Sequence, residues 1–281
     1  MKSIGKELAI HSETERGIWV TWTVIVVLSS LLGDSLILIG TIKYKAIKLN
    51  KIIVAVMQHM AVCDILQTVL RVLPTTLALI TDDWFLGEVL CHIHHNMGHV
   101  CTGVTLFLTC TLTTVKYLIV RYPFRARVWT ARLGHKVCVA VWLLQLCLVA
   151  PTTVVDVLIG GTVYFNYWTY TCAYDISNYP TGSKWYASSG YIVFIFIPVV
   201  IMIVTSTLLL MAAKRSAARQ GHGLQMSGVI TVLLTVMVLI ISNVPTIVAL
   251  LITFIEPGFD VGGTTWGCLL YTSDAADDLL C

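Results

Sequence analysis

Residues 52–80 read IIVAVMQHMAVCDILQTVLRVLPTTLALI, a long apolar run whose only charged side chains are Asp64 and Arg71. A helix needs about 20 mostly apolar residues to cross the hydrocarbon core of a bilayer. Inside that core a helix is favoured because it satisfies every backbone N–H and C=O group within one segment. The run is long enough to cross with some tilt, so it predicts a membrane-spanning helix.

Similar runs lie on both sides of this one. Six apolar runs follow one another along the chain, at about residues 18–42, 52–80, 91–120, 137–159, 186–213 and 224–255. Because the connections between them are short, neighbouring helices should be antiparallel. The sequence therefore predicts an all-α membrane protein in which residues 18–266 form the bundle and residues 1–17 form a polar tail.

The composition excludes a soluble globular protein. Only 12% of the 281 residues are charged and 57% are hydrophobic, whereas a soluble domain has about 25% charged residues. A nucleic-acid-binding protein is also disfavoured, because the net charge is only +3. The basic residues moreover lie in short loops rather than along one groove.

Lysine and arginine mark the cytoplasmic loops, since short loops rich in these residues stay inside the cell. Three alternate loops carry basic residues and no acid: Lys43, Lys45, Lys48 and Lys51; Arg121, Arg125, Arg127, Arg132 and Lys136; Lys214, Arg215 and Arg219. The opposite loops carry six acids and one lysine: Asp82, Asp83, Glu88, Asp175, Glu256, Asp260 and Lys184. We therefore expect a multi-pass plasma-membrane protein with an extracellular N-terminus.

Two of the nine cysteines, Cys91 and Cys172, fall on the extracellular side by this charge argument. That compartment oxidises thiols, so we expect a disulfide between them. Closing a loop of about 80 residues would stabilise the fold by roughly 4 kcal/mol in the chain-entropy model. The bridge would also hold the long loop after the fourth span across the mouth of the bundle.

Asp34 and Asp64 are ionisable groups inside membrane spans, which are costly and therefore candidates for a functional site. Antiparallel packing would place them at similar depths, within roughly 6 Å. Two carboxyl groups that close do not readily both ionise, so either one stays protonated or a cation lies between them. The alternative is a structural pair of neutral acids that are hydrogen-bonded in the core.

Several short motifs occur in a fixed order along these spans. They are Gly33-Asp34, Met60-Ala61-Val62-Cys63-Asp64, Trp84-Phe85-Leu86-Gly87 with Cys91, Lys116-Tyr117-Leu118, Arg121-Tyr122-Pro123-Phe124, Trp142, Pro151, Phe196-Ile197-Pro198 and Ser242-Asn243-Val244-Pro245. With these motifs, the chain resembles a rhodopsin-like (class A) G-protein-coupled receptor from Ile18 to about Trp266. The resemblance implies a seven-transmembrane receptor-type bundle, here with six spans present. It also implies an extracellular ligand and a heterotrimeric G protein as partners.

The resemblance also assigns expected roles to residues. Asp64 resembles the family's sodium ligand, although the first-span partner is Asp34 instead of the usual Asn. Lys116 and Tyr117 resemble the G-protein switch, with Val115-Lys116 in place of Asp-Arg. The expected hinge residues are Pro198, Asn243 and Pro245. Asn243 replaces the usual aromatic residue of the sixth span, and Ser206 replaces a tyrosine of the fifth.

Four residues near the extracellular side indicate the chemical class of the ligand. Gly98 occupies the position where amine receptors have Asp, which disfavours a cationic amine. Arg71 either receives a ligand carboxylate or pairs with an acid such as Glu88 or Asp156. His95 and His99 share one helical face and are expected to line the pocket, although histidine-rich tracts also bind zinc or iron. A peptide or a small acidic ligand is favoured. The aromatic, β-prone segment 160–172 supports this prediction, because it resembles the hairpin lid of peptide receptors.

Two other interpretations remain open. The first is a small transporter or channel, which would show internal repeats, and no repeat in this sequence is convincing. The second is a receptor fragment that cannot signal. An enzyme is disfavoured, since the eight histidines do not form facing metal-binding boxes. We expect no cofactor beyond a possible sodium ion at Asp64, and no structural metal. Residues 267–281 are expected to be a non-native tail on a truncated receptor, since the segment from Cys268 resembles a translated sequencing adapter.

Overall fold

The computed structural model describes residues 3–4, 13–43, 50–126, 128–158, 163–167, 170–174, 196–212, 214–215, 234 and 237. The long helices are α1 (Glu13–Lys43), α2 (Lys51–Gln67), α4 (Gly87–Arg121) and α6 (Ala131–Leu158). Helix α2 continues through a π-helical turn, η1 (Thr68–Val72), into the shorter helix α3 (Leu73–Thr81). The short elements are α5 (Pro123–Ala126), β1 (Ser3–Ile4), β2 (Val163–Asn166) and β3 (Thr171–Tyr174). A shorter apolar helix covers Phe196–Ala212.

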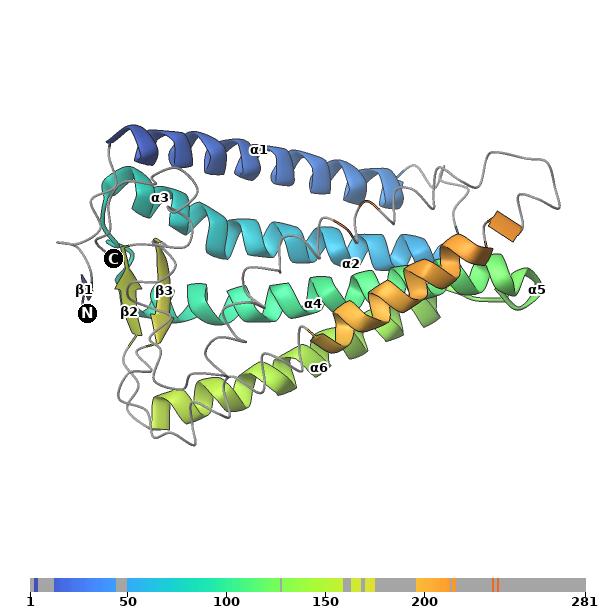
Figure 1. The fold of residues 1–281 in the computed structure, drawn as a ribbon. Coiled ribbons are helices and arrows are strands. Elements are labelled where there is room, and N and C mark those ends of the chain that lie inside the picture. Colours follow the sequence, from blue (N-terminus) through green and yellow to red (C-terminus); the bar gives the residue numbers. More distant parts are fainter. Residues whose placement is uncertain are drawn as a thin grey trace, which may run out of the picture.

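Four helical segments in this part of the chain are long and apolar enough to cross a membrane: Glu13–Lys43, Lys51–Thr81, Gly87–Arg121 and Ala131–Pro151. In Figure 1 they run side by side, with the strands at one end and α5 at the other. The predicted helical membrane bundle is therefore present. The expected sixth span, residues 224–255, lies outside the described residues apart from isolated positions.

Helix ends differ from the ends of the apolar runs. Helix α1 begins at Glu13, five residues before the apolar run, with acidic residues in its first turn that interact favourably with the helix dipole. Helix α2 is capped by Asn50, whose side-chain oxygen accepts a hydrogen bond of 3.1 Å from the Ile52 N–H. Polar capping residues extend helices beyond the hydrocarbon, so hydropathy locates the membrane segment rather than the helix.

The second span contains a π-helical turn just before Pro74. Proline has no N–H to donate, so the regular ladder is interrupted there. The Leu73 N–H instead donates to the carbonyl of Thr68, five residues earlier. This turn changes the direction in which the following side chains point, and Arg71 lies within it.

A buried core lies between α2, α4 and α6. Its buried members are Ile52, Val56, Cys63, Val100, Cys101, Val104, Leu108, Cys138 and Val141. Helix α1, in contrast, exposes many large apolar side chains, such as Trp22 and Leu36. Such exposed apolar surface is stable in lipid and not in water, which fits a membrane protein.

Gly134 of α6 is predicted to be essential to the packing of α6 on α2. A Cβ atom at Gly134 would lie 2.8 Å from the Ala55 Cβ and 3.2 Å from the Ile52 Cα, so the two helices would have to separate. We expect Gly134→Ala to destabilise the protein by about 1–3 kcal/mol. Gly40→Ala is the matched control, because nothing lies within 4 Å of its added Cβ. Equal thermal unfolding midpoints of the two variants in lipid nanodiscs would contradict this prediction.

Candidate functional site

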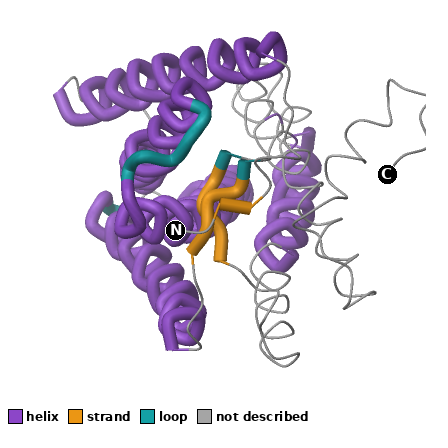
Figure 2. The backbone as a smooth tube through the Cα atoms, turned by 90° about the vertical axis from the view of Figure 1, so that its left-hand side faces the viewer, coloured by secondary structure: helices purple, strands orange, loops and turns teal. Residues whose placement is uncertain are grey.

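A β-hairpin lid covers one end of the helices (Figure 2). Strands β2 and β3 pair antiparallel with Phe165 opposite Cys172, and β1 pairs parallel to β2. The expected disulfide between Cys91 and Cys172 is present, with 5.4 Å between the two Cα atoms. It joins β3 to the first turns of α4, so the predicted brace between the lid and the bundle is confirmed.

Aromatic packing holds the lid against the helices. The ring of Trp84 lies 5.6 Å from that of Phe165 and 5.4 Å, edge-on, from that of His94. Such pairs contribute beyond the area they bury. The lid cluster comprises Ala78, Leu79, Trp84, Cys91, Val163, Phe165, Tyr167, Tyr170 and Cys172.

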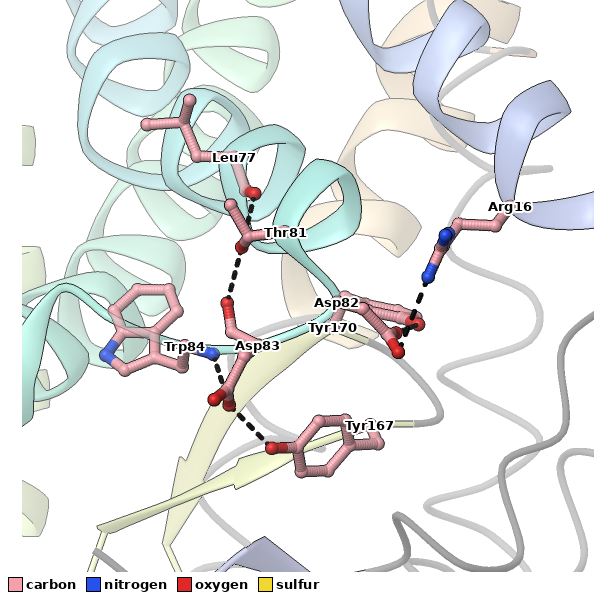
Figure 3. Close-up of polar contacts among 8 residues, drawn as sticks. All are labelled: Arg16, Leu77, Thr81, Asp82, Asp83, Trp84, Tyr167 and Tyr170. Carbon is pink, nitrogen blue, oxygen red and sulfur yellow. Dashed lines mark hydrogen bonds and ion pairs between the residues drawn. The ribbon is translucent and has the colours of Figure 1, made fainter. Parts of the chain in front are cut away.

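Polar contacts fix the lid to the turn between α3 and α4 (Figure 3). The Tyr167 hydroxyl donates to Asp83 Oδ1 and the Tyr170 hydroxyl donates to Asp82 Oδ1, each at 2.6 Å. Asp82 has a positive φ of 55° where α3 ends, and its Oδ2 lies 3.4 Å from Arg16 Nη1. Two loops and α1 are thereby held together at the mouth of the bundle.

The lid tyrosines are predicted to stay protonated far into alkaline pH. Burial and the hydrogen bonds to Asp83 and Asp82 raise the pKa values of Tyr167 and Tyr170 to about 12, from an ordinary value near 10. Their contribution to stability is therefore complete below about pH 10 and is lost as pH rises through about 12. Tyrosinate absorbance, recorded immediately after a pH jump, should show a component with a midpoint near pH 12 in the native protein and not in the Tyr167→Phe/Tyr170→Phe variant. A midpoint near pH 10 in the difference between the two titrations would contradict the prediction, because the other tyrosines of the chain contribute equally to both proteins.

Beneath the lid, His95 and His99 form a hydrogen-bonded pair. The Cys172 carbonyl oxygen lies 3.1 Å from His95 Nδ1, and a carbonyl only accepts, so Nδ1 carries the hydrogen. In the neutral ring His95 Nε2 then accepts, and His99 Nε2, 3.1 Å away, donates to it. The pair therefore connects the interior face of α4 to the lid strand β3.

Arg71 lies against α4 at Gly98. A Cβ atom at Gly98 would lie 3.0 Å from both Cζ and Nη1 of Arg71, so the guanidinium group occupies the space where a side chain at position 98 would begin. Arg71 is also close enough to act electrostatically on the imidazoles of α4, those of His94, His95 and His99. The structure thus brings the predicted pocket residues Arg71, His95 and His99 together.

The other histidines of this region have different surroundings. His94 is buried, and its Nε2 lies 3.0 Å from the Thr75 hydroxyl. His92 Nε2 lies 3.9 Å from Oε1 of Glu88, one of the two acids that the sequence offers as a partner for Arg71. Within the described ranges, no group of three or more histidine, cysteine or acidic side chains is arranged to hold a metal ion.

Asp34 and Asp64 also lie near each other, close enough for their charges to interact. Two hydroxyls connect their helices. Ser30 Oγ lies 2.8 Å from Asp34 Oδ2 and 2.8 Å from Thr68 Oγ1, and Thr68 Oγ1 lies 2.8 Å from the backbone oxygen of Asp64. The first span is thereby linked to the start of the π-helical turn.

The C-terminal end of α4 carries Lys116 and Tyr117, both half-buried near the last turns of that helix. Around the end of the helix, the guanidinium carbons of Arg121 and Arg125 lie 5.2 and 5.8 Å from the ring centroid of Tyr122. The Asn50 side chain donates to the Ala126 carbonyl, which ties α5 to the start of α2. This end presents a basic surface whose backbone is held in place.

One predicted hinge residue, Pro198, lies in the helix Phe196–Ala212. The Cys110 thiol donates to the Pro198 carbonyl oxygen at 3.1 Å, and the hydroxyls of Thr113 and Thr205 lie 3.1 Å apart. These contacts join α4 to the helix that carries Pro198. The other two hinge residues, Asn243 and Pro245, lie outside the described residues.

The sequence did not predict the contacts of three polar side chains within the spans, those of Ser30, Thr68 and Gln145. Ser30 lies four residues before Asp34, a spacing that places both on one helical face and could have indicated their contact. Thr68 has the same spacing from Asp64. Gln145 is buried, and its side chain fills the space above Gly103, where a Cβ would overlap it. A polar residue in the middle of an apolar span, such as Gln145, by itself indicates a side chain with a polar contact inside the bundle.

The chain matches the family described as 7 transmembrane receptor (rhodopsin family) over residues 33–272. It is 25% identical over 139 residues to dopamine receptor 2 of Caenorhabditis elegans, covering 46% of this chain and 15% of that protein. It is 24% identical over 196 residues to the cholecystokinin receptor of Xenopus laevis, covering 69% and 43%. It is 25% identical over 206 residues to medium-wave-sensitive opsin 1 of Sciurus carolinensis, covering 71% and 54%. The chain thus spans between 15% and 54% of the length of these relatives.

The family match extends over well more than half of the chain and includes α2, α4 and α6. The members of this family are membrane receptors and not enzymes. The apolar helices described above agree with a multi-pass membrane protein. The chain belongs to the rhodopsin family of seven-transmembrane receptors.

Proposed function

We propose that this protein is a plasma-membrane receptor for an extracellular ligand that carries a negatively charged group, and that it activates a heterotrimeric G protein. The N-terminus and the lid would face the outside of the cell, and the basic loops would face the cytoplasm. The observation that carries the ligand class is the contact between Arg71 and Gly98.

That contact favours an anion over an amine. A receptor that binds an amine needs a negative charge in its pocket, but at Gly98 there is no side chain and the Arg71 guanidinium lies beside the backbone. Guanidinium groups bind carboxylates through paired, charge-assisted hydrogen bonds. The hydrogen-bonded imidazoles of His95 and His99 lie near this guanidinium group and would form part of the pocket wall around the rest of the ligand.

The lid supports a peptide or a small acidic molecule as the ligand. It is held by a disulfide and by two tyrosine–aspartate hydrogen bonds. A lid fixed in this way is preorganised, so that less conformational entropy is lost when a ligand binds beneath it. Aromatic side chains on its two strands provide amphipathic contact area for such a ligand.

On the cytoplasmic side, we assign the G-protein switch to Lys116 and Tyr117. They lie at the inner end of α4, the helix that also carries His95, His99 and Gly98 at its outer half. A ligand that favours one arrangement of α4 and its neighbours shifts the population of the state that binds the G protein. Arg121 and Arg125 add positive charge beside that end.

Asp64 would supply the charged oxygen for the sodium ion that the family implies. It is half-buried in α2, and the Asp34 carboxyl group lies near it. A half-buried carboxylate within a membrane bundle is a chemically suitable site for a small hard cation.

The test is nucleotide exchange on purified heterotrimeric G protein, measured with membranes that contain the full chain. The panel of ligands comprises acidic peptides, small carboxylates and, as the opposing class, primary amines. We expect carboxylate-bearing compounds to accelerate exchange and Arg71→Gln to remove the response. Acceleration by amines alone would overturn the ligand class. Saturable carboxylate binding without exchange would instead show a receptor fragment that does not signal.

A further inference from the structure

Two histidine side chains from different helices meet on the outside of the bundle. His59 Nε2 of α2 lies 3.2 Å from His135 Nδ1 of α6, and the two residues are 76 positions apart in the chain. The ring centroids are 5.4 Å apart and the ring planes are tilted by 56°, so the rings do not stack. The two rings are therefore directed at each other through these nitrogen atoms.

The backbones beside this pair are held close together. Gly134, the neighbour of His135, approaches α2 so closely that an added Cβ would lie 2.8 Å from the Ala55 Cβ. Ala55 in turn lies four residues before His59, about one helical turn away. Both helices also contribute to the buried core between α2, α4 and α6. The positions of the two rings are thus fixed by the packing of the helices and not only by the contact between the rings.

The spacing of the two nitrogens suits two ligands of one metal ion. Zinc binds imidazole nitrogens at about 2.0–2.1 Å in a tetrahedral arrangement, which places two ligand nitrogens about 3.3–3.4 Å apart. The observed 3.2 Å is shorter by only about 0.1–0.2 Å, a difference that small side-chain rotations supply. Imidazole is a preferred ligand of zinc, copper and nickel. We propose that His59 and His135 together bind a divalent transition metal ion, with zinc as the expected ion.

Water would provide the remaining ligands. In the part of the chain that the structure describes, no group of three or more histidine, cysteine or acidic side chains is arranged around a metal ion. His135 is exposed, and it lies two residues before the apolar run 137–159, at the border of the hydrocarbon core. Water can reach the ion there and complete the tetrahedron, as it does at open zinc sites. The neighbouring Arg132 and Lys136 are exposed, so water also weakens their repulsion of a cation.

Binding changes the tautomers of the two rings and involves no oxidation. Each neutral imidazole carries one N–H, and in the metal-free pair one facing nitrogen donates to the other. In the metal-bound pair both facing nitrogens are ligands, so the hydrogens lie on His59 Nδ1 and His135 Nε2. The number of hydrogens on the pair stays the same. The ion would cross-link α2 to α6, whatever the ligand class and the G protein of the receptor are.

The thermal unfolding midpoint of the full chain in lipid nanodiscs tests this site, with chelator-treated protein before and after addition of zinc chloride. We expect zinc to raise the midpoint, because the ion binds the folded state. His59→Gln and His135→Asn should each lose this rise, since an amide keeps a hydrogen-bonding group near the lost nitrogen but is a poor ligand for zinc. The double variant should lose no more than either single variant, because one ion needs both rings.

His92→Gln is the matched control, because His92 is half-buried like His59 but lies near Glu88 in the first turns of α4. It should keep the rise. A rise that persists in His59→Gln or in His135→Asn would overturn the proposal, and so would a native chain whose midpoint zinc does not change.

A second measurement needs no substitution and stays informative if a variant does not fold. Diethyl pyrocarbonate modifies imidazole nitrogens, and mass spectrometry reports the extent of modification at each histidine. In the native chain, zinc should slow the modification of His59 and His135 together and leave that of His92 unchanged. Unchanged modification of both residues, or protection of only one of them, would contradict a shared metal ion.

Discussion

Replacing Cys91 with serine is expected to remove most of the folded receptor from the cell surface. The bridge to Cys172 closes a loop with a sequence separation of 81 residues, which corresponds to roughly 4 kcal/mol in the chain-entropy model. Its loss would also leave β3, and the Cys172 carbonyl that accepts from His95, without a covalent attachment to α4. Losses of this size are comparable to the total stability of many domains.

The measurement is the thermal unfolding midpoint of purified protein, with and without a reductant, alongside surface labelling of intact cells. Cys147→Ser is the matched control, because Cys147 is a free and exposed cysteine. Cys172→Ser should match Cys91→Ser, and the double variant should be no worse than either, since all three remove one bond. A Cys91→Ser protein as stable as Cys147→Ser would contradict a structural role for the bridge.

The membrane helices could be predicted from the sequence because the thickness of the hydrocarbon core sets a minimum apolar length. Residues 52–80 met that requirement and form a continuous helical segment, Lys51–Thr81. The π-helical turn inside it was not predicted. Pro74 indicated an interruption, but hydropathy does not say whether a helix kinks, tightens or widens there.

The disulfide could be predicted because topology placed Cys91 and Cys172 in the same oxidising compartment. The contacts of Tyr167 with Asp83 and of Tyr170 with Asp82 could not, because residues more than 80 positions apart are brought together only by the folded hairpin. The same limit applies to Arg71 and Gly98. The sequence marks each residue separately as a candidate for the ligand side, but their contact depends on where the π-helical turn directs the arginine.

Introducing an acid at Gly98 is expected to abolish the response to anionic ligands. A side chain at this position would begin 3.0 Å from the Arg71 guanidinium, so the carboxylate of Gly98→Asp would form an ion pair with it inside the pocket. The flexible end of the arginine can shift by the few tenths of an ångström that the new Cβ needs. The ligand would then have to displace an internal carboxylate from its own binding partner.

The expected loss of potency is at least about 30-fold, since removing one partner of a buried, hydrogen-bonded charge pair costs about 2–5 kcal/mol. The measurement is the concentration of the most potent carboxylate that half-maximally accelerates nucleotide exchange. Gly98→Ala is the matched control, because it adds the same Cβ without a charge and should retain most of the potency. If the two variants lost potency equally, the space beside Gly98 would matter and the Arg71 charge would not. If neither lost potency, the anion would bind elsewhere in the receptor, and Arg71 would serve only to pack α4 against the π-helical turn.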